Sequence, residues 1–198
     1  MMLRVGQFNL PSRERYEAAM RGIFERRYYT NQGPLARAFE ERLQAMLNVK
    51  HAVCVTNATI GMMMAIDALG IRGRVIAPAV ANMTLAQALR WCGVEAVSTD
   101  VNALDGHLDV DALAASIADR GTVSAIACAP LWGAACDTSS LVALAREHGL
   151  PLMFDSSHAF GCVAAGRQVG TDGDAQVLSF DAADIVNAAG AACVATDN

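Results

Sequence analysis

The sequence predicts an α/β fold: a mostly parallel, seven-stranded sheet with helices on both faces. Seven short apolar runs of strand length follow residue 50. The first five alternate with segments of helical periodicity, which is the pattern of parallel sheets with covered faces. Glycine or proline ends several of these segments, as expected for short connections between strands and helices.

Two helices are expected before the first strand. Residues 12–27 repeat apolar side chains at helical spacing, for example Tyr16 and Met20. Gly33-Pro34 breaks this pattern, and residues 35–47 resume it as a second amphipathic helix.

The strands and the helices between them follow in order. A methionine-rich helix ends at Leu69, and Gly93 and Gly149 stop two later helices. We expect strands at 51–55, 74–77, 96–99, 123–129, 152–155, 177–180 and 192–196, and further helices at 82–92, 109–118 and 138–148.

Length and composition indicate one domain that associates with a partner. The 198 residues suit a single domain, which we divide into an N-terminal helical arm of about residues 1–50 and a sheet domain of about 51–198. Hydrophobic residues make up 54% and charged residues 18% of the chain. Because this is more apolar than a typical soluble domain, we expect a homodimer or heteromer joined through apolar faces.

Charge and hydropathy exclude several classes of protein. The net charge is −5, with no basic cluster beyond Arg26-Arg27, which argues against a nucleic-acid partner. No apolar run is long enough to span a membrane, and the N-terminus lacks a signal-peptide core, so we expect a cytoplasmic protein without a membrane partner. The six cysteines form no C-x-x-C motif and are typical of small core residues in a reduced cytosol.

Candidate catalytic residues follow two of the predicted strands. Asp155 ends one strand and His158 lies three residues later; Ser179 ends another and precedes Asp181 and Asp184. Carboxyl ends of strands are where α/β sheets build their sites. Asp155 could pair with a cationic ring nitrogen, orient His158, cap a neighbouring helix or pair with an arginine. No metal site is predicted, although an Asp/Asp/His cluster has suitable ligands for a divalent metal.

A candidate phosphate site follows the first strand. Asn57, Ala58 and Thr59 lie between this strand and the next helix, where backbone N–H groups can bind an anion. Taken alone, these residues favour a simple helix N-cap over a phosphate site, because Thr and Asn are preferred at that position.

Several segments together resemble the large domain of the DegT/StrS-type sugar aminotransferases, which use pyridoxal phosphate (PLP) on the aspartate-aminotransferase scaffold. In that family, the residue that corresponds to Asp155 holds the protonated pyridine nitrogen. The segments that correspond to 56–59 and Ser179 contact the phosphate. The matching segments are 29–35 (YTNQGPL), 50–53 (KHAV), 56–59 (TNAT), 88–93 (ALRWCG), 131–133 (LWG), 154–161 (FDSSHAFG), 166–174 (GRQVGTDGD) and 179–180 (SF).

The departures from the family pattern concern the cofactor. Where the family continues S-F-H-A-T-K, Asp181 replaces the histidine and Asp184 replaces the lysine that forms the Schiff base. A carboxylate cannot form an imine, so covalent capture of PLP in the family's way is excluded. Ala58 replaces a glycine of the phosphate loop, and the chain ends after the seventh strand without the family's small C-terminal domain.

Three hypotheses for the function result. The first is a PLP-independent enzyme without a cofactor, in which Asp155, His158, Asp181 and Asp184 perform acid/base chemistry on a sugar or natural-product biosynthetic intermediate. The second is a non-catalytic pseudoenzyme that binds a biosynthetic enzyme. The third is a protein that holds PLP or pyridoxamine phosphate (PMP) non-covalently, as some lysine-less members of the family do.

Overall fold

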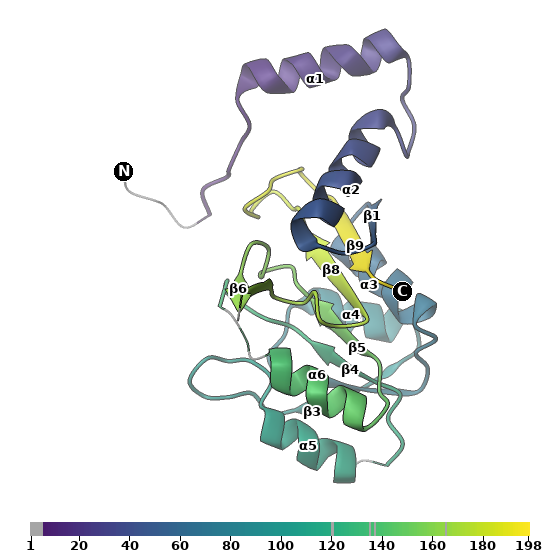
Figure 1. Cartoon of the computed structure of the whole chain (residues 1–198), viewed down its shortest axis with the longest axis vertical. Helices are drawn as coiled ribbons and strands as arrows, with labels where there is room; N and C mark the ends of the chain where they lie inside the picture. The colour runs from purple at the N-terminus through teal and green to yellow at the C-terminus, as the bar shows by residue number, and fades with distance from the viewer. Residues whose placement is uncertain (1–5, 120, 135, 137, 165) are drawn as a thin grey trace.

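Seven strands form one sheet, with the order β1-β9-β8-β5-β4-β2-β3 (Figure 1). The computed structural model describes residues 6–119, 121–134, 136, 138–164 and 166–198. The strands of this sheet are β1 (His51–Val55), β2 (Arg74–Pro78), β3 (Glu95–Thr99), β4 (Ala125–Cys128), β5 (Leu152–Asp155), β8 (Ala175–Ser179) and β9 (Ala192–Thr196). The helices are α1 (Arg13–Arg26), α2 (Pro34–Leu47), α3 (Ala58–Ala68), α4 (Met83–Trp91), α5 (Val110–Asp119) and α6 (Thr138–Glu147).

Strand direction gathers most strand ends at one edge of the sheet. β9 pairs antiparallel with both β1 and β8, whereas the pairs β8–β5, β5–β4, β4–β2 and β2–β3 are parallel. All strands of this sheet except β9 therefore share one direction, and their carboxyl ends share one edge. The predicted α/β class and mostly parallel sheet are confirmed.

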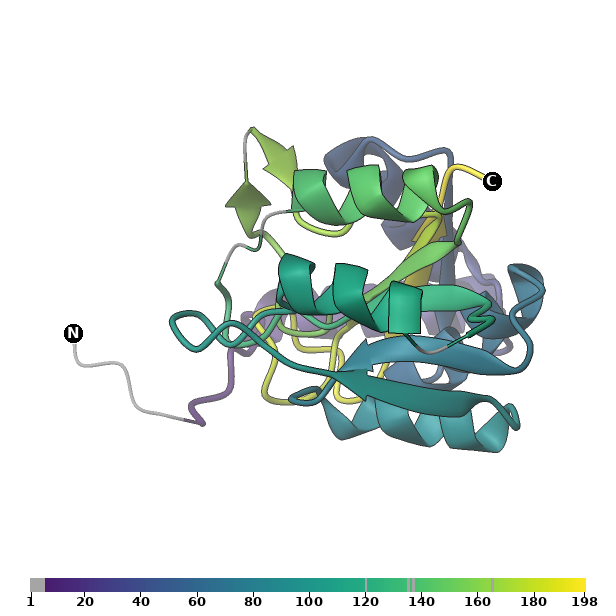
Figure 2. The ribbon, with the colours of Figure 1, turned by 90° about the horizontal axis from the view of Figure 1, so that it is seen from below.

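Helices cover both faces of the sheet, as Figure 2 shows. Helices α3 and α4 pack on one face, where Val75, Met153 and Val177 belong to their apolar cluster. Helices α5 and α6 pack on the opposite face, with Ile76 and Phe154 in their cluster. Neighbouring strand residues thus point to opposite faces, as the twofold period of a strand requires. Helix α2 covers β1 and β9 on the same face as α5 and α6.

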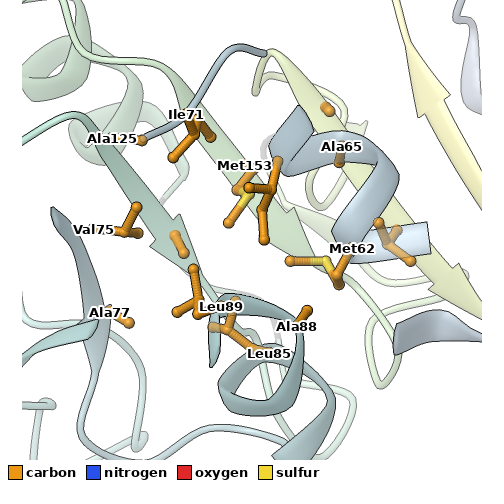
Figure 3. Packing of buried hydrophobic residues seen from close by; sticks show 14 of the residues in the cluster. Met62, Ala65, Ile71, Val75, Ala77, Leu85, Ala88, Leu89, Ala125 and Met153 are labelled. Carbon is orange, nitrogen blue, oxygen red and sulfur yellow. The ribbon is translucent and has the colours of Figure 1, made fainter. Parts of the chain in front are cut away.

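Small residues allow α3 and α4 to lie close to the sheet (Figure 3). Ala65 of α3 and Ala88 of α4 are fully buried beside larger side chains such as Met62 and Leu89. At Gly61, an added Cβ would lie 2.9 Å from a methyl carbon of Val177 in β8. This close packing fixes the N-terminus of α3 near the end of β8.

Helix α1 stands apart from the sheet (Figure 1) and has no buried residue. Ser12 caps its N-terminus by accepting from the backbone N–H of Arg15. Tyr16 and Phe24 are 57% and 64% exposed, although helical periodicity places them on an apolar side. The division of the chain into an arm and a sheet domain stays a prediction.

Most predicted boundaries differ from the structure by at most one residue, and two strands differ by two residues at one end. Strand β8 begins at Ala175 rather than at residue 177, because the polar Gln176 is buried within the sheet and pairs with Phe154. Strand β4 spans only Ala125–Cys128 instead of residues 123–129. The short antiparallel pair β6 (Val163–Ala164) and β7 (Arg167–Gln168) was not predicted, because two-residue strands show no periodicity.

Candidate functional site

A cavity of about 360 Å³ lies at the edge where the parallel strands end. Its walls come from segments that follow β1, β2, β5 and β8 and from the segment that precedes β9. Its lining residues are Asn57, Ala58, Thr59, Asn82, Thr84, Ser157, His158, Ser179, Asp181, Ala183, Asp184, Gly190 and Ala191. The candidate residues chosen from two distant parts of the sequence therefore meet here.

Asp155 ends β5 and is 1% exposed, so it lies just behind this lining. Its Oδ1 accepts hydrogen bonds from the hydroxyl of Ser157 at 2.5 Å and from the Ser157 backbone N–H at 3.2 Å. Its Oδ2 is buried and has no hydrogen-bond partner among the residues that the structure describes. Burial raises the pKa of Asp155, and the bonds from Ser157 oppose this increase only in part.

The loop that precedes β8 holds β5 in place. Asp174 accepts from the backbone N–H of Leu152 through Oδ2 at 2.8 Å. At Gly173, an added Cβ would lie 2.7 Å from the ring of Phe154, so the loop backbone packs directly on the strand. This loop thereby fixes the strand that ends at Asp155.

The candidate phosphate segment forms the start of α3. Asn57 is the N-cap, and its Oδ1 accepts from the backbone N–H of Ile60 at 2.9 Å. Ala58 and Thr59 belong to the first turn, where N–H groups lack intrahelical partners. Ser179, at the end of β8, lines the same cavity. The N-cap is thus observed, and the first turn of α3 lies at the cavity wall.

Asp184 and Asp181 lie in one hydrogen-bonded turn beside the cavity. The Oδ2 of Asp184 accepts from the backbone N–H of Asp181 at 2.6 Å, and the Asp184 N–H donates back to the Asp181 carbonyl at 3.1 Å. Asp181 also accepts from the N–H of Ala182 at 2.9 Å. Both carboxylates therefore stabilise the local backbone, and Asp184 is held in one orientation at the cavity wall.

His158 is exposed and lines the cavity. Both hydrogen bonds to the Asp155 carboxylate in the described part of the chain come from Ser157. The alternative that Asp155 orients His158 is therefore replaced by an Asp155–Ser157 pair. The charge of His158 also lowers the pKa of Asp155, but this effect is smaller than those of burial and of the Ser157 hydrogen bonds.

Sequence reasoning missed several lining residues. Ser157 follows Asp155 by two positions, and this spacing is typical of a side chain that bonds the backbone two residues on. Asn82 is the N-cap of α4 and lies just past the end of β2. Both residues carry local signals that could have placed them at the strand edge. Gly190 and Ala191 give no such signal.

The only lysine among the 198 residues is Lys50, which lies at the far end of β1 from the cavity. Its Nζ donates to the backbone carbonyl of Asp197 at 2.9 Å. The five residues of β1 separate it from the segment at Asn57, a strand length of about 17 Å. No lysine of this sequence lies at the cavity.

Two further features are absent from the described residues. They contain no group of three or more His, Cys, Asp or Glu side chains arranged to hold a metal ion. Within the same residues, none of the helices combines the length and apolar character needed to cross a membrane.

The profile of the DegT/DnrJ/EryC1/StrS aminotransferase family matches residues 12–198. The chain belongs to this family. Among curated relatives, dTDP-4-amino-4,6-dideoxy-D-glucose transaminase of Shigella dysenteriae is 29% identical over 181 residues, covering 91% of this chain and 49% of the relative. GDP-perosamine synthase of Vibrio cholerae is 31% identical over 155 residues, or 77% of this chain and 42% of the relative. The chain spans about half the length of these relatives.

Solved structures share this fold over nearly the whole chain. DesI, crystallised in the presence of its TDP-sugar product, is 40% identical, with a TM-score of 0.92 over 99% of this chain and 50% of DesI. The E. coli GDP-4-keto-6-deoxy-D-mannose-3-dehydratase, solved with bound hydrated PLP, has a TM-score of 0.89 at 18% identity, over 100% of this chain and 52% of the dehydratase. These matches confirm the aminotransferase large-domain fold that the motifs indicated.

Family membership corrects the expectation about the cofactor. The sequence was interpreted as a protein without a cofactor because Asp184 replaces the lysine. The family is one of aminotransferases, and the dehydratase with the same fold holds hydrated PLP. The expectation of no cofactor is therefore wrong.

Proposed function

We propose that this chain holds PLP or PMP without a covalent bond, as part of an enzyme that modifies a sugar intermediate. The observation that carries the proposal is the buried, unpartnered Oδ2 of Asp155. A buried polar atom without a hydrogen bond costs about 1–3 kcal/mol, and more when it is charged. The protonated ring nitrogen of the cofactor is the kind of donor that removes this cost.

The phosphate end of the cofactor fits the other side of the cavity. The first turn of α3 at Ala58 and Thr59 supplies backbone N–H groups and the positive end of a helix dipole. Thr59 and Ser179 add hydroxyl groups to the same wall. The cavity lining there contains no lysine or arginine, so the helix terminus provides its principal attraction for an anion.

The absence of a lysine at the cavity supports non-covalent binding. Lys50 is tied to Asp197 at the opposite end of β1, and Asp184 cannot form an imine. When bound, the cofactor supplies a ring that accepts electrons from the reacting carbon. Asp155 holds the charge on the ring nitrogen, and Ser157 holds Asp155 in place.

Proton transfer in this proposal falls to His158. Its imidazole is exposed at the cavity, and histidine is the side chain that enzymes use most often for proton transfer. Asp184 is bound to the backbone of Asp181 and so fixes the loop beside the site. The relatives act on nucleotide-linked sugars by name, which supports a sugar derivative as the substrate.

The test is to incubate the purified chain with PLP, remove unbound cofactor by gel filtration and treat one half with borohydride. We expect PLP to be retained and to be released on denaturation, with no pyridoxyl adduct in the intact mass. Lys50→Arg serves as the control, because it removes the only lysine without changing the cavity. Retention that disappears in Lys50→Arg, or no retention by either protein, would overturn the proposal.

A second candidate function is a structural partner that pairs with another copy of this chain. Helix α1 favours this function, because it has no buried residue and exposes the apolar side chains of Tyr16 and Phe24. We expect light scattering to give a dimer mass for the intact chain, and Phe24→Ser to shift it toward the monomer. A monomeric intact chain would contradict this candidate.

A further inference from the structure

Two cysteines outside the cavity lie directly opposite each other in the sheet. Cys54 of β1 pairs with Cys193 of β9 in the antiparallel register. The backbone N–H of Cys54 donates to the carboxylate of Glu40 in α2 at 2.8 Å and therefore does not point toward β9. This makes Cys54 and Cys193 a pair without backbone hydrogen bonds between them, the type whose Cα atoms approach to about 4.5 Å. Disulfides form at Cα separations of about 4.4–6.8 Å.

The two thiols also share one face of the sheet. Ala52 precedes Cys54 by two residues, and it lies with Cys193 and Ala195 in the apolar cluster under α2. The interaction between the two thiols lowers the pKa of Cys54 and raises that of Cys193. The Cys193 Sγ itself donates to the backbone carbonyl of Val194 at 3.4 Å. Cys54 is therefore the more acidic of the two thiols.

The more acidic thiol, Cys54, is also the more exposed of the two cysteines. Cys54 is half-buried and lines a hollow of about 670 Å³ between β1 and the segment that joins α1 to α2. Cys193 is fully buried. A small reagent in this hollow can reach Cys54 first, and Cys193 lies opposite Cys54 in the neighbouring strand.

We propose that Cys54 and Cys193 are a redox-active pair that closes to a reversible disulfide when the protein meets a hydroperoxide. The Cys54 thiolate attacks the peroxide oxygen, which gives a sulfenic acid at Cys54 and releases water or an alcohol. The Cys193 thiol then attacks the Cys54 sulfur, forms the S–S bond and releases water. Two thiols are oxidised and one peroxide is reduced, and a dithiol reductant reverses the step.

A disulfide between Cys54 and Cys193 should stabilise the fold and link two parts of the cavity wall. It would join the edge strand β1 to β9, and these residues are far apart in sequence, so the unfolded chain is strongly constrained. Cys54 lies three residues before Asn57, and Cys193 lies two residues after Ala191; both of these neighbours line the cavity. Oxidation would therefore tie together two segments of the cavity wall.

The other cysteines provide internal controls. Cys136 and burial raise the pKa of Cys128, and both cysteines are buried and do not line the hollow at Cys54. Cys92 has a pKa that is raised by burial, which disfavours its thiolate. Neither arrangement combines an accessible thiolate with a thiol placed opposite to it.

The test treats the whole chain with a small excess of hydrogen peroxide and counts thiols after denaturation. We expect the count to fall from six to four, because one disulfide consumes two thiols, and to return to six with dithiothreitol. Peptide mapping should find residues 54 and 193 cross-linked, and the melting temperature of the oxidised protein should increase. In Cys193→Ser, Cys54 should instead stop at a sulfenic acid that dimedone traps.

Cys136→Ser is the matched control, because it removes one thiol of the other pair and should still form the 54–193 link. An unchanged thiol count, a link between other cysteines or dimedone labelling elsewhere in Cys193→Ser would overturn the proposal. The measurement needs no cofactor, so its failure is distinct from a failure of the proposed function.

Discussion

Ser157 directs two hydrogen bonds to one oxygen of Asp155, from its hydroxyl at 2.5 Å and from its backbone N–H at 3.2 Å. The other oxygen is buried, and the described part of the chain gives it no hydrogen-bond partner. This asymmetry fixes the carboxylate while leaving one oxygen for a ligand. The residue thus has the geometry expected of a group that completes its hydrogen bonding only when a cation binds.

The pH dependence of cofactor binding should report the ionisation of Asp155. Burial raises the pKa of this carboxyl, so binding of PMP should weaken as the pH falls through that raised value, because the protonated acid cannot pair with the ring nitrogen. Ser157→Ala removes a hydrogen bond that lowers the pKa, so the midpoint should move to higher pH. Equilibrium dialysis across a pH series measures both.

Ser156→Ala is the matched control for Ser157→Ala. The Ser156 hydroxyl is equally buried but has no hydrogen-bond partner, and it belongs to the neighbouring residue. Its removal should leave the midpoint unchanged. Equal shifts in both variants would show that Ser157 acts on the fold generally rather than on Asp155.

Asp155 should also lower the stability of the cofactor-free protein. Its folded-state pKa lies above the ordinary 3.8, so the folded state binds this proton more tightly than the unfolded chain does. The favourable contribution is complete below the unfolded pKa and is lost as the pH rises through the folded pKa. Asp155→Asn should therefore raise the free energy of unfolding at pH 7 by on the order of 1 kcal/mol.

This gain in Asp155→Asn should vanish in acid, where the carboxyl is protonated in both states. Urea denaturation at pH 7 and near pH 3 checks it, with Asp181→Asn as an exposed control. A loss of stability at pH 7 in Asp155→Asn would contradict the account of an uncompensated buried charge.

Because Asp184 corresponds to the family's lysine, restoring a lysine there should restore covalent binding of PLP. Asp184→Lys should form a covalent adduct with PLP that borohydride fixes at residue 184. The substitution removes the acceptor for the Asp181 N–H, so it should cost about 0.5–1.5 kcal/mol of stability. Mass spectrometry of the reduced protein locates the adduct.

Asp181→Lys, in the same turn, is the control for the alignment of residues 179–184 with the family's S-F-H-A-T-K motif. It should give no adduct, because the matching of S-F-H-A-T-K places residue 181 at the family's histidine. An adduct at 181 with none at 184 would refute the register.

The role of Asn57 as the N-cap of α3 should be separable from its role beside a bound phosphate. Asn57→Ala removes the hydrogen bond to the Ile60 N–H and should cost about 0.5–2 kcal/mol of stability. Asn57→Asp keeps a capping oxygen, so its stability should stay close to that of the original chain, while its negative charge should weaken binding of a phosphate. Thermal unfolding and PMP titration distinguish the two effects. Unimpaired PMP binding by Asn57→Asp would place the phosphate elsewhere.

The sequence predicted most of the fold because its signals are local and repeated. The apolar run that ends at Asp155 and the glycine stop after α4 are examples of such signals. The start of β8 was misplaced because Gln176 is polar yet buried, and only the tertiary fold shows that burial. Strands of two residues, such as β6, are too short for any period to be visible.

Part of the site could also be predicted. Asp155 and Asn57 were found because they follow apolar strands, and strand ends collect at one edge in a parallel sheet. The pairing of Cys54 with Cys193 could not be found, since it depends on the register between strands far apart in the sequence. The error about the cofactor came from giving one substitution, Asp184, more weight than the retained residues around it.

The central claim is that Asp155 holds the cofactor without covalent attachment, and PMP titration tests it most directly. PMP has no aldehyde, so its binding reports the non-covalent contacts alone. Hydrogen bonds to charged groups contribute about 1.5–3 kcal/mol, and 1.4 kcal/mol is about tenfold in affinity. We therefore predict saturable binding of PMP to the original chain and an affinity lower by about tenfold to a hundredfold in Asp155→Asn. Equal affinity in the two proteins, or no saturable binding to either, would contradict the account.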